Sequence, residues 1–193
     1  MITCATGADW SQFRGPGGLG ISNETGLPGQ WAAEENVVWR TALPGPGGSS
    51  PVVVGDRVYL TSYTGYGLEQ GEGDENYLMR HLLCVDRQSG SILWTKQFEP
   101  KLPEHRYQGE GALHGFSSST PTSDGERLYV FFGKSGVFCF DLDGNQIWQA
   151  SVGDQTSGWG SATSPILCGN LLIVNASVES GALVALEKTT GEE

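Results

Sequence analysis

The stretch of sequence that decides the fold is residues 83–94, LCVDRQSGSILW. An apolar run leads into an acidic residue, a glycine follows within a tight turn, and a second apolar run ends on a tryptophan. Related stretches occupy residues 138–148, FCFDLDGNQIW, and residues 184–193, VALEKTTGEE. Two short apolar runs joined by such a turn predict a β-hairpin. Because the pattern recurs, we predict that the chain is built from repeats.

A second hairpin precedes each of these stretches. Residues 49–60 read SSPVVVGDRVYL, residues 119–130 read STPTSDGERLYV, and residues 163–174 read TSPILCGNLLIV. Each contains two apolar runs separated by a pair of turn-forming residues. A repeat therefore holds four short strands in antiparallel succession, and no segment shows sustained helical spacing of apolar residues.

Repeated four-stranded units of this size are typical of a β-propeller. We therefore predict an all-β fold, a β-propeller of four-stranded antiparallel blades, with about three blade-equivalents in this chain that form part of a larger ring. The predicted divisions are residues 1–8 as a leader remnant or disordered N-terminus, 9–35 as an N-terminal extension, 36–42 as the last strand of a blade, 49–98 as a blade, 117–152 as a blade, and 161–193 as an incomplete blade.

Three blades are fewer than the usual minimum of four, so the chain is not expected to close a ring alone. Two explanations stay open. Either the chain is part of a longer protein that supplies the missing half of the propeller, or identical chains complete one another's blades by strand exchange.

The residues that recur in the repeats are predicted to be structural anchors. A buried indole offers a large apolar area and a donor for a carbonyl of the neighbouring unit, while the turn residues supply local hydrogen bonds and positive φ angles. These anchors are Trp39, Trp94, Trp148, Asp86, Asp141, Gly90 and Gly144. Cys84 and Cys139 both lie two residues before the aspartate of a turn, where we expect a small buried residue, and we predict that they are unpaired.

The repeats resemble a known family. Residues 85–94 and 185–192 look like the A-x-D-x-x-T-G-x-x-x-W repeat of the pyrroloquinoline-quinone-like (PQQ-like) propellers, and residues 9–16 resemble the segment that opens the mature form of many secreted members. The resemblance implies a propeller fold and an exported protein. It leaves the task open, because the family includes both quinone-dependent dehydrogenases and non-enzymatic binding or scaffold proteins.

The composition excludes several classes of function. The net charge is -11 and the few basic residues are scattered, so we expect no nucleic-acid or anionic-membrane surface. No apolar run is long enough for a transmembrane segment. The sequence contains no hydrolase or phosphate-binding motif, and no cysteine or histidine has metal-ligand spacing.

We therefore predict a periplasmic or secreted binding or scaffold module, without catalysis or a cofactor of its own, whose partner is an unknown protein or a polysaccharide. The alternative is part of a quinoprotein dehydrogenase that binds PQQ with calcium. The predicted partner surface lies where the chain departs from its repeats, in the connector 101–118 and in the Gly/Ser-rich segment 157–163. Its candidate residues are Arg106, Tyr107, His114, Phe116 and Trp159. Lipidation of Cys4 stays open.

Overall fold

The computed structural model describes residues 7–68, 73–109 and 111–193. The question of Cys4, and most of the predicted leader remnant 1–8, lies outside these residues. In the described part, three antiparallel sheets follow one another along the chain. Short apolar strands rich in Val, Leu, Tyr and Phe form them, and glycines with positive φ make tight turns between strands.

The first two sheets each contain four strands in the order of the sequence, and the third contains three. We call them the first, second and third blades. The first blade consists of β1 (Val52–Val54), β2 (Arg57–Thr64), β3 (Met79–Asp86) and β4 (Ile92–Phe98). The second consists of β5 (Thr122–Ser123), β6 (Arg127–Phe131), β7 (Val137–Asp141) and β8 (Gln146–Ala150), and the third of β9 (Ile166–Cys168), β10 (Leu171–Ala176) and β11 (Ala182–Glu187).

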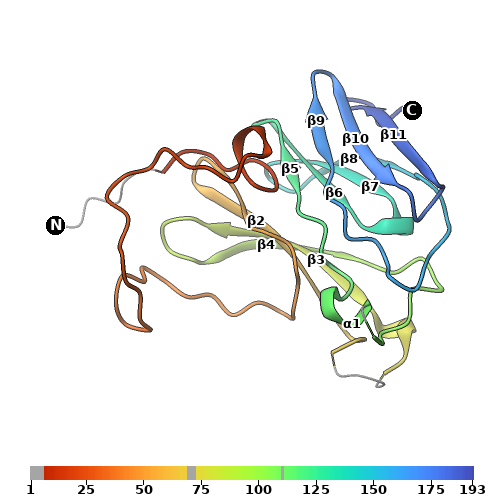
Figure 1. Ribbon diagram of the computed structural model, residues 1–193, viewed down its shortest axis with the longest axis horizontal. Helices are drawn as coiled ribbons and strands as arrows, with labels where there is room; N and C mark the ends of the chain where they lie inside the picture. Colours follow the sequence, from red (N-terminus) through yellow and green to blue (C-terminus); the bar gives the residue numbers. More distant parts are fainter. Residues whose placement is uncertain (1–6, 69–72, 110) are drawn as a thin grey trace.

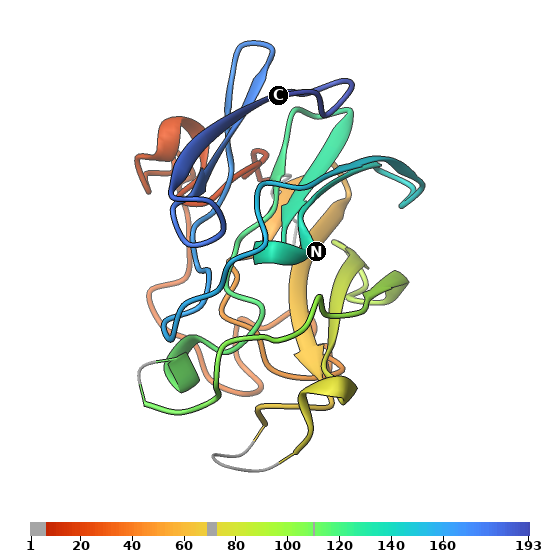
Figure 2. The same ribbon diagram turned by 90° about the vertical axis from the view of Figure 1, so that its right-hand side faces the viewer.

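Helical structure is confined to short turns in the described residues. These are η1 (Pro16–Gly18), η2 (Glu75–Tyr77), α1 (Gly111–His114) and η3 (Gly133–Ser135). The blades are arranged like a fan, with the second between the first and the third (Figures 1 and 2). The predicted all-β fold of antiparallel propeller blades is confirmed.

Two apolar layers hold the fan together. One face of the first blade packs on the second blade through residues such as Leu82 and Phe138, and the opposite face of the second blade packs on the third through residues such as Phe131 and Leu172. These side chains are buried, and removal of their apolar surface from water supplies most of the contact energy. Consecutive blades are thus joined face to face.

In the first two blades, a small residue is buried at the position where the repeat predicts one. Cys84 and Cys139 are fully buried and carry free thiols. Burial raises the pKa of Cys84 to about 11 and that of Cys139 to about 12, so both thiols stay protonated at neutral pH. In the third blade the same position is Ala185, which is exposed because no described sheet covers that face.

Residues 36–42 differ from the prediction, because they form no strand. A strand needs a neighbouring strand to satisfy its backbone groups, and within the described residues none lies beside this segment. Its side chains are nevertheless fixed. The Trp39 indole Nε1 donates to the Arg87 carbonyl at 2.8 Å, and the Thr41 hydroxyl donates to the Gly90 carbonyl at 2.5 Å.

The N-terminal extension crosses the first strands of two blades. Trp10 forms an isolated antiparallel bridge with Val53, with backbone hydrogen bonds of 2.9 and 3.0 Å. The next carbonyl, that of Ser11, accepts from the backbone N–H of Ser123 at 2.8 Å. This segment therefore ties β1 to β5.

Each tryptophan anchor lies against the turn of the blade that follows it. Trp39 contacts the turn at residues 86–90, Trp94 the turn at 141–144, and Trp148 the turn at 187–191. Trp148 Nε1 donates to the Lys188 carbonyl at 3.1 Å, as Trp39 does to Arg87. In all three turns a glycine faces the indole, and a side chain there would collide with the ring.

Trp94 is the exception among the three. The equivalent acceptor is the carbonyl of Leu142, but Arg57 Nη1 and the Tyr59 hydroxyl donate to it instead. The turn at residues 141–144 is also one residue shorter than the other two. Trp94 Nε1 is buried without a hydrogen-bond partner among the described residues.

This difference predicts unequal effects of the same substitution. Trp148→Phe should cost about 1 kcal/mol more stability than Trp94→Phe, because only the first substitution removes a hydrogen bond. Removing the unpaired N–H of Trp94 also relieves a desolvation cost. Urea unfolding followed by circular dichroism measures the two values. Equal losses would contradict the assignment of the hydrogen bonds.

Candidate binding site

The connector between β4 and β5 and the loop between β8 and β9 meet at one end of the fan. His114, at the end of α1, hydrogen-bonds through Nε2 to the backbone carbonyl of Trp159. His114 also lies beside His105, with ring centroids 5.5 Å apart. The Trp159 indole is exposed. The structure thus brings together segments that are separated in the sequence by the whole second blade.

Phe116 forms the core of the connector. Its ring packs on His105 at 4.4 Å, on Tyr63 at 5.4 Å and on Tyr107 at 6.0 Å between centroids, and its side chain is buried. Phe116 therefore supports the surface from below and does not present itself to a partner. Tyr107 is half-buried.

Arg106 is exposed and lies on the wall of a groove. The groove has a volume of about 740 Å³ and runs between the connector and the loop at residues 156–158. Arg106, Tyr107, His114 and Trp159 thus lie on two adjoining segments around this end of the fan. We call these four residues the connector surface.

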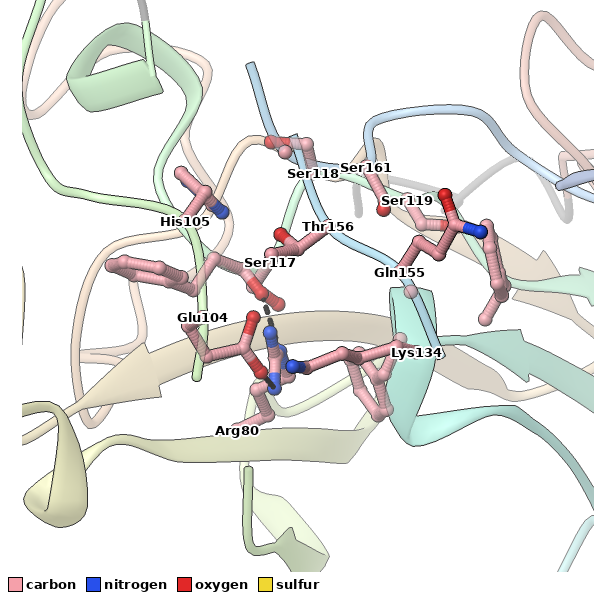
Figure 3. Close-up of a pocket in the computed structure, with 15 residues that line it drawn as sticks. Arg80, Glu104, His105, Ser117, Ser118, Ser119, Lys134, Gln155, Thr156 and Ser161 are labelled. Carbon is pink, nitrogen blue, oxygen red and sulfur yellow. Dashed lines mark hydrogen bonds and ion pairs between the residues drawn. The ribbon is translucent and has the colours of Figure 1, made fainter. Parts of the chain in front are cut away.

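A polar cavity lies beneath this surface, and the sequence did not reveal it. Arg80, from the start of β3, forms an ion pair with Glu104 of the connector at 2.8 Å, with side chains only 5% and 6% exposed. Arg80 Nε also donates to the Phe116 carbonyl at 2.8 Å. Lys134, from η3 of the second blade, is buried and points toward the same pair (Figure 3).

The cavity has a volume of about 20 Å³. That volume holds one or two water molecules. The hydroxyls of Ser117 and Ser119 line the cavity and have no hydrogen-bond partner among the described residues. These hydroxyls and the Lys134 ammonium are suited to bind such water. The cavity therefore joins the first blade, the second blade and the connector through polar contacts.

One signal in the sequence could have indicated this cavity. Arg80 and His81 directly precede the apolar run at residues 82–85, and all six residues are buried in β3, so both faces of the strand are covered. A charged residue in such a strand requires a buried partner. Glu104, 24 positions further on, has no local pattern that would identify it as that partner.

The residues do not fit a calcium–quinone centre. Among the described residues there is no group of three or more His, Cys, Asp or Glu side chains that could hold a metal ion. The polar cavity of the described residues is lined by Arg80 and Lys134, whose positive charges repel a cation.

The fold and the docked tryptophans define a class of protein, the β-propeller repeat proteins built from four-stranded blades. A family model described as outer membrane protein assembly factor BamB matches residues 30–192, and the chain belongs to this family of PQQ-like repeat proteins. The resemblance deduced from the repeat turns is therefore confirmed.

Individual relatives agree with this assignment. The chain is 30% identical over 159 residues to outer membrane protein assembly factor BamB of Burkholderia pseudomallei (strain K96243), a match that covers 81% of this chain and 32% of the relative. The chain thus spans about a third of the length of that relative.

Two solved structures share the fold. The crystal structure of BamB from Moraxella catarrhalis matches with a TM-score of 0.51 and 18% identity, over 80% of this chain and 40% of that one. A quinohemoprotein alcohol dehydrogenase from Pseudomonas putida HK5 matches with a TM-score of 0.53 and 16% identity, over 80% and 21%. At these identities the likeness concerns the fold alone. In the described part of the chain, no helix has the length and apolarity needed to span a membrane.

Proposed function

We propose that this chain is an exported, non-catalytic propeller module that holds a protein partner during outer-membrane protein assembly. The observation that carries the proposal is the match of residues 30–192 to the family described as an outer-membrane assembly factor. A periplasmic location follows from the same proposal. The module works without a cofactor of its own, as its similarity to an assembly factor suggests.

We place the partner on the connector surface. Exposed tryptophan, tyrosine and arginine residues are the side chains that contribute most to protein–protein binding. Trp159 is exposed and has no role in the blade repeats, unlike the three anchor tryptophans. The groove beside Arg106 can receive an extended segment of a partner.

Site-specific photo-crosslinking in cells tests this assignment. A photoreactive residue in place of Trp159, in the exported protein, should link to a protein component of outer-membrane assembly, identified by mass spectrometry. The same residue in place of Ile147, an exposed position on the outer strand of the second blade, serves as the control and should give no such product. Equal products at both positions, or a polysaccharide adduct at Trp159, would overturn the assignment.

A further inference from the structure

The polar cavity beneath the connector surface carries more positive than negative charge. Among the Lys, Arg, Asp and Glu side chains that line it, Arg80 and Lys134 are cationic and only Glu104 is a carboxylate. Arg80 is paired with Glu104. Lys134 is only 6% exposed, and it has no ion-pair partner among the described residues. The wall of the cavity therefore holds a buried ammonium group whose charge is not balanced by direct contact.

The other buried carboxylate of this region does not supply that contact. Glu179 is buried, but it does not line the cavity. It lies against Gly133, and its Oε1 accepts a hydrogen bond from the Ser161 hydroxyl. The ion pairs of the described residues include none between Glu179 and Lys134. Lys134 instead points toward the space beside Arg80 (Figure 3).

Two serine hydroxyls complete a set of hydrogen-bond donors around this space. Ser117 and Ser119 are buried, and their Oγ atoms have no hydrogen-bond partner among the described residues. Buried polar groups that the protein leaves unpaired indicate a partner from outside the chain. Water can satisfy the two hydroxyls, but it cannot balance the charge of Lys134. An acceptor with two oxygens and one negative charge does both, and a carboxylate has these properties.

The cavity adjoins the groove of about 740 Å³ that runs beside Arg106, because Glu104, His105 and Thr156 line both spaces. A side chain held in the groove therefore has a short path to Lys134. The cavity itself has space for one or two water molecules, which the two oxygens of a carboxylate can replace. A tetrahedral phosphate or sulfate group is too large for this space.

We propose that the cavity binds the carboxylate of an aspartate or glutamate side chain of the protein partner. This inference rests on the proposed function, since it names the type of residue that the segment in the groove carries. Lys134 and the two serine hydroxyls donate to the carboxylate oxygens, and Arg80 stays paired with Glu104. The net charge of -11 repels an acidic segment from most of the surface, so this local excess of positive charge also selects where the segment binds.

Removing the charge of Lys134 should have an effect that a structural lysine would not show. Lys134→Met keeps a side chain of similar length and removes a buried charge that has no partner in the unbound protein. The variant should be at least as stable as the unmodified chain in urea unfolding, because an unpaired buried charge is costly. A clear loss of stability would show that Lys134 serves the fold and would overturn the proposal.

Formate, the smallest carboxylate, tests the cavity without a partner. In the unmodified chain, sodium formate should raise the midpoint of thermal unfolding more than sodium chloride at the same concentration, because a ligand that binds only the folded state stabilises it. In Lys134→Met the two salts should act alike. Lys96→Met, on the outer strand β4 of the first blade, is the matched control and should respond as the unmodified chain does. An equal response of the unmodified chain to both salts would overturn the carboxylate site.

Photo-crosslinking from position 159 identifies the occupant as a side chain of the partner. With Lys134→Met in place, the yield of the crosslinked product should fall roughly tenfold, because the contact loses a charge-assisted hydrogen bond. Lys96→Met should leave the yield unchanged. An undiminished yield with Lys134→Met would overturn the partner's carboxylate as the occupant while the proposed function stands. Absence of any product from the unmodified chain would instead overturn the proposed function, and with it this occupant.

Discussion

Replacing Glu104 with alanine is expected to lower the free energy of unfolding by about 3–5 kcal/mol, the usual cost of removing one partner from a buried ion pair. The Arg80 guanidinium would lose its only described carboxylate partner and keep the Phe116 carbonyl and a weak contact with Ser135. Lys134 lines the same cavity and adds a second buried positive charge. Urea unfolding monitored by tryptophan fluorescence measures the loss.

Two further variants separate the cost of an unpaired charge from the value of the pair. Replacing both Arg80 and Glu104 with leucine should recover most of the lost stability, because apolar residues of similar volume often replace a buried ion pair at little cost. Arg57→Ala removes an ion pair with Asp143 that is largely exposed to solvent. Loss of this ion pair should cost no more than about 1 kcal/mol, in addition to the loss of the hydrogen bond that Arg57 donates to a backbone carbonyl. A Glu104→Ala variant as stable as Arg57→Ala would show that water reaches the Arg80 guanidinium.

Much of the fold could be predicted from the sequence because its information is local. Each hairpin has its apolar runs and turn residues within about a dozen positions, as in residues 83–94. The same alignment predicts a small buried residue at positions 84 and 139. In the structure Cys84 and Cys139 are both fully buried, because the next blade covers them. Where a sheet is not covered, the alignment misleads, as at Ala185, which is exposed.

The remaining features depend on contacts that the sequence pattern does not encode. Residues 36–42 have the composition of a last strand, but a strand forms only beside a neighbour, and the described chain places none there. The ion pair of Arg80 with Glu104 joins a strand to an irregular connector, and only the folded structure brings them together. The candidate residues of the predicted partner surface show the same limit. Phe116 is buried, whereas Trp159 is exposed, although both follow a glycine in a Gly/Ser-rich segment.

The second large effect is expected at Gly90. Its φ is +73°, and a Cβ there would lie 2.6 Å from Cδ2 of the Trp39 indole. Gly90→Ala should therefore cost about 2–4 kcal/mol, which combines the strain of a left-handed backbone with the displacement of a packed ring. Thermal and urea unfolding measure it. Gly55→Ala is the matched control, because Gly55 has a φ of +56° with no atom within 4 Å of the added carbon, and it should cost only about 1–2 kcal/mol.

A double-mutant cycle links this cost to the indole itself. With Trp39→Ala in place, Gly90→Ala should cost no more than Gly55→Ala, because the ring that the new methyl group would meet is gone. If Gly90→Ala costs more with Trp39 present than with Trp39→Ala, the difference shows that Trp39 holds residues 36–42 against the first blade, as a last strand is held in a complete ring. If Gly90→Ala costs the same with and without Trp39, the indole is not held at this turn.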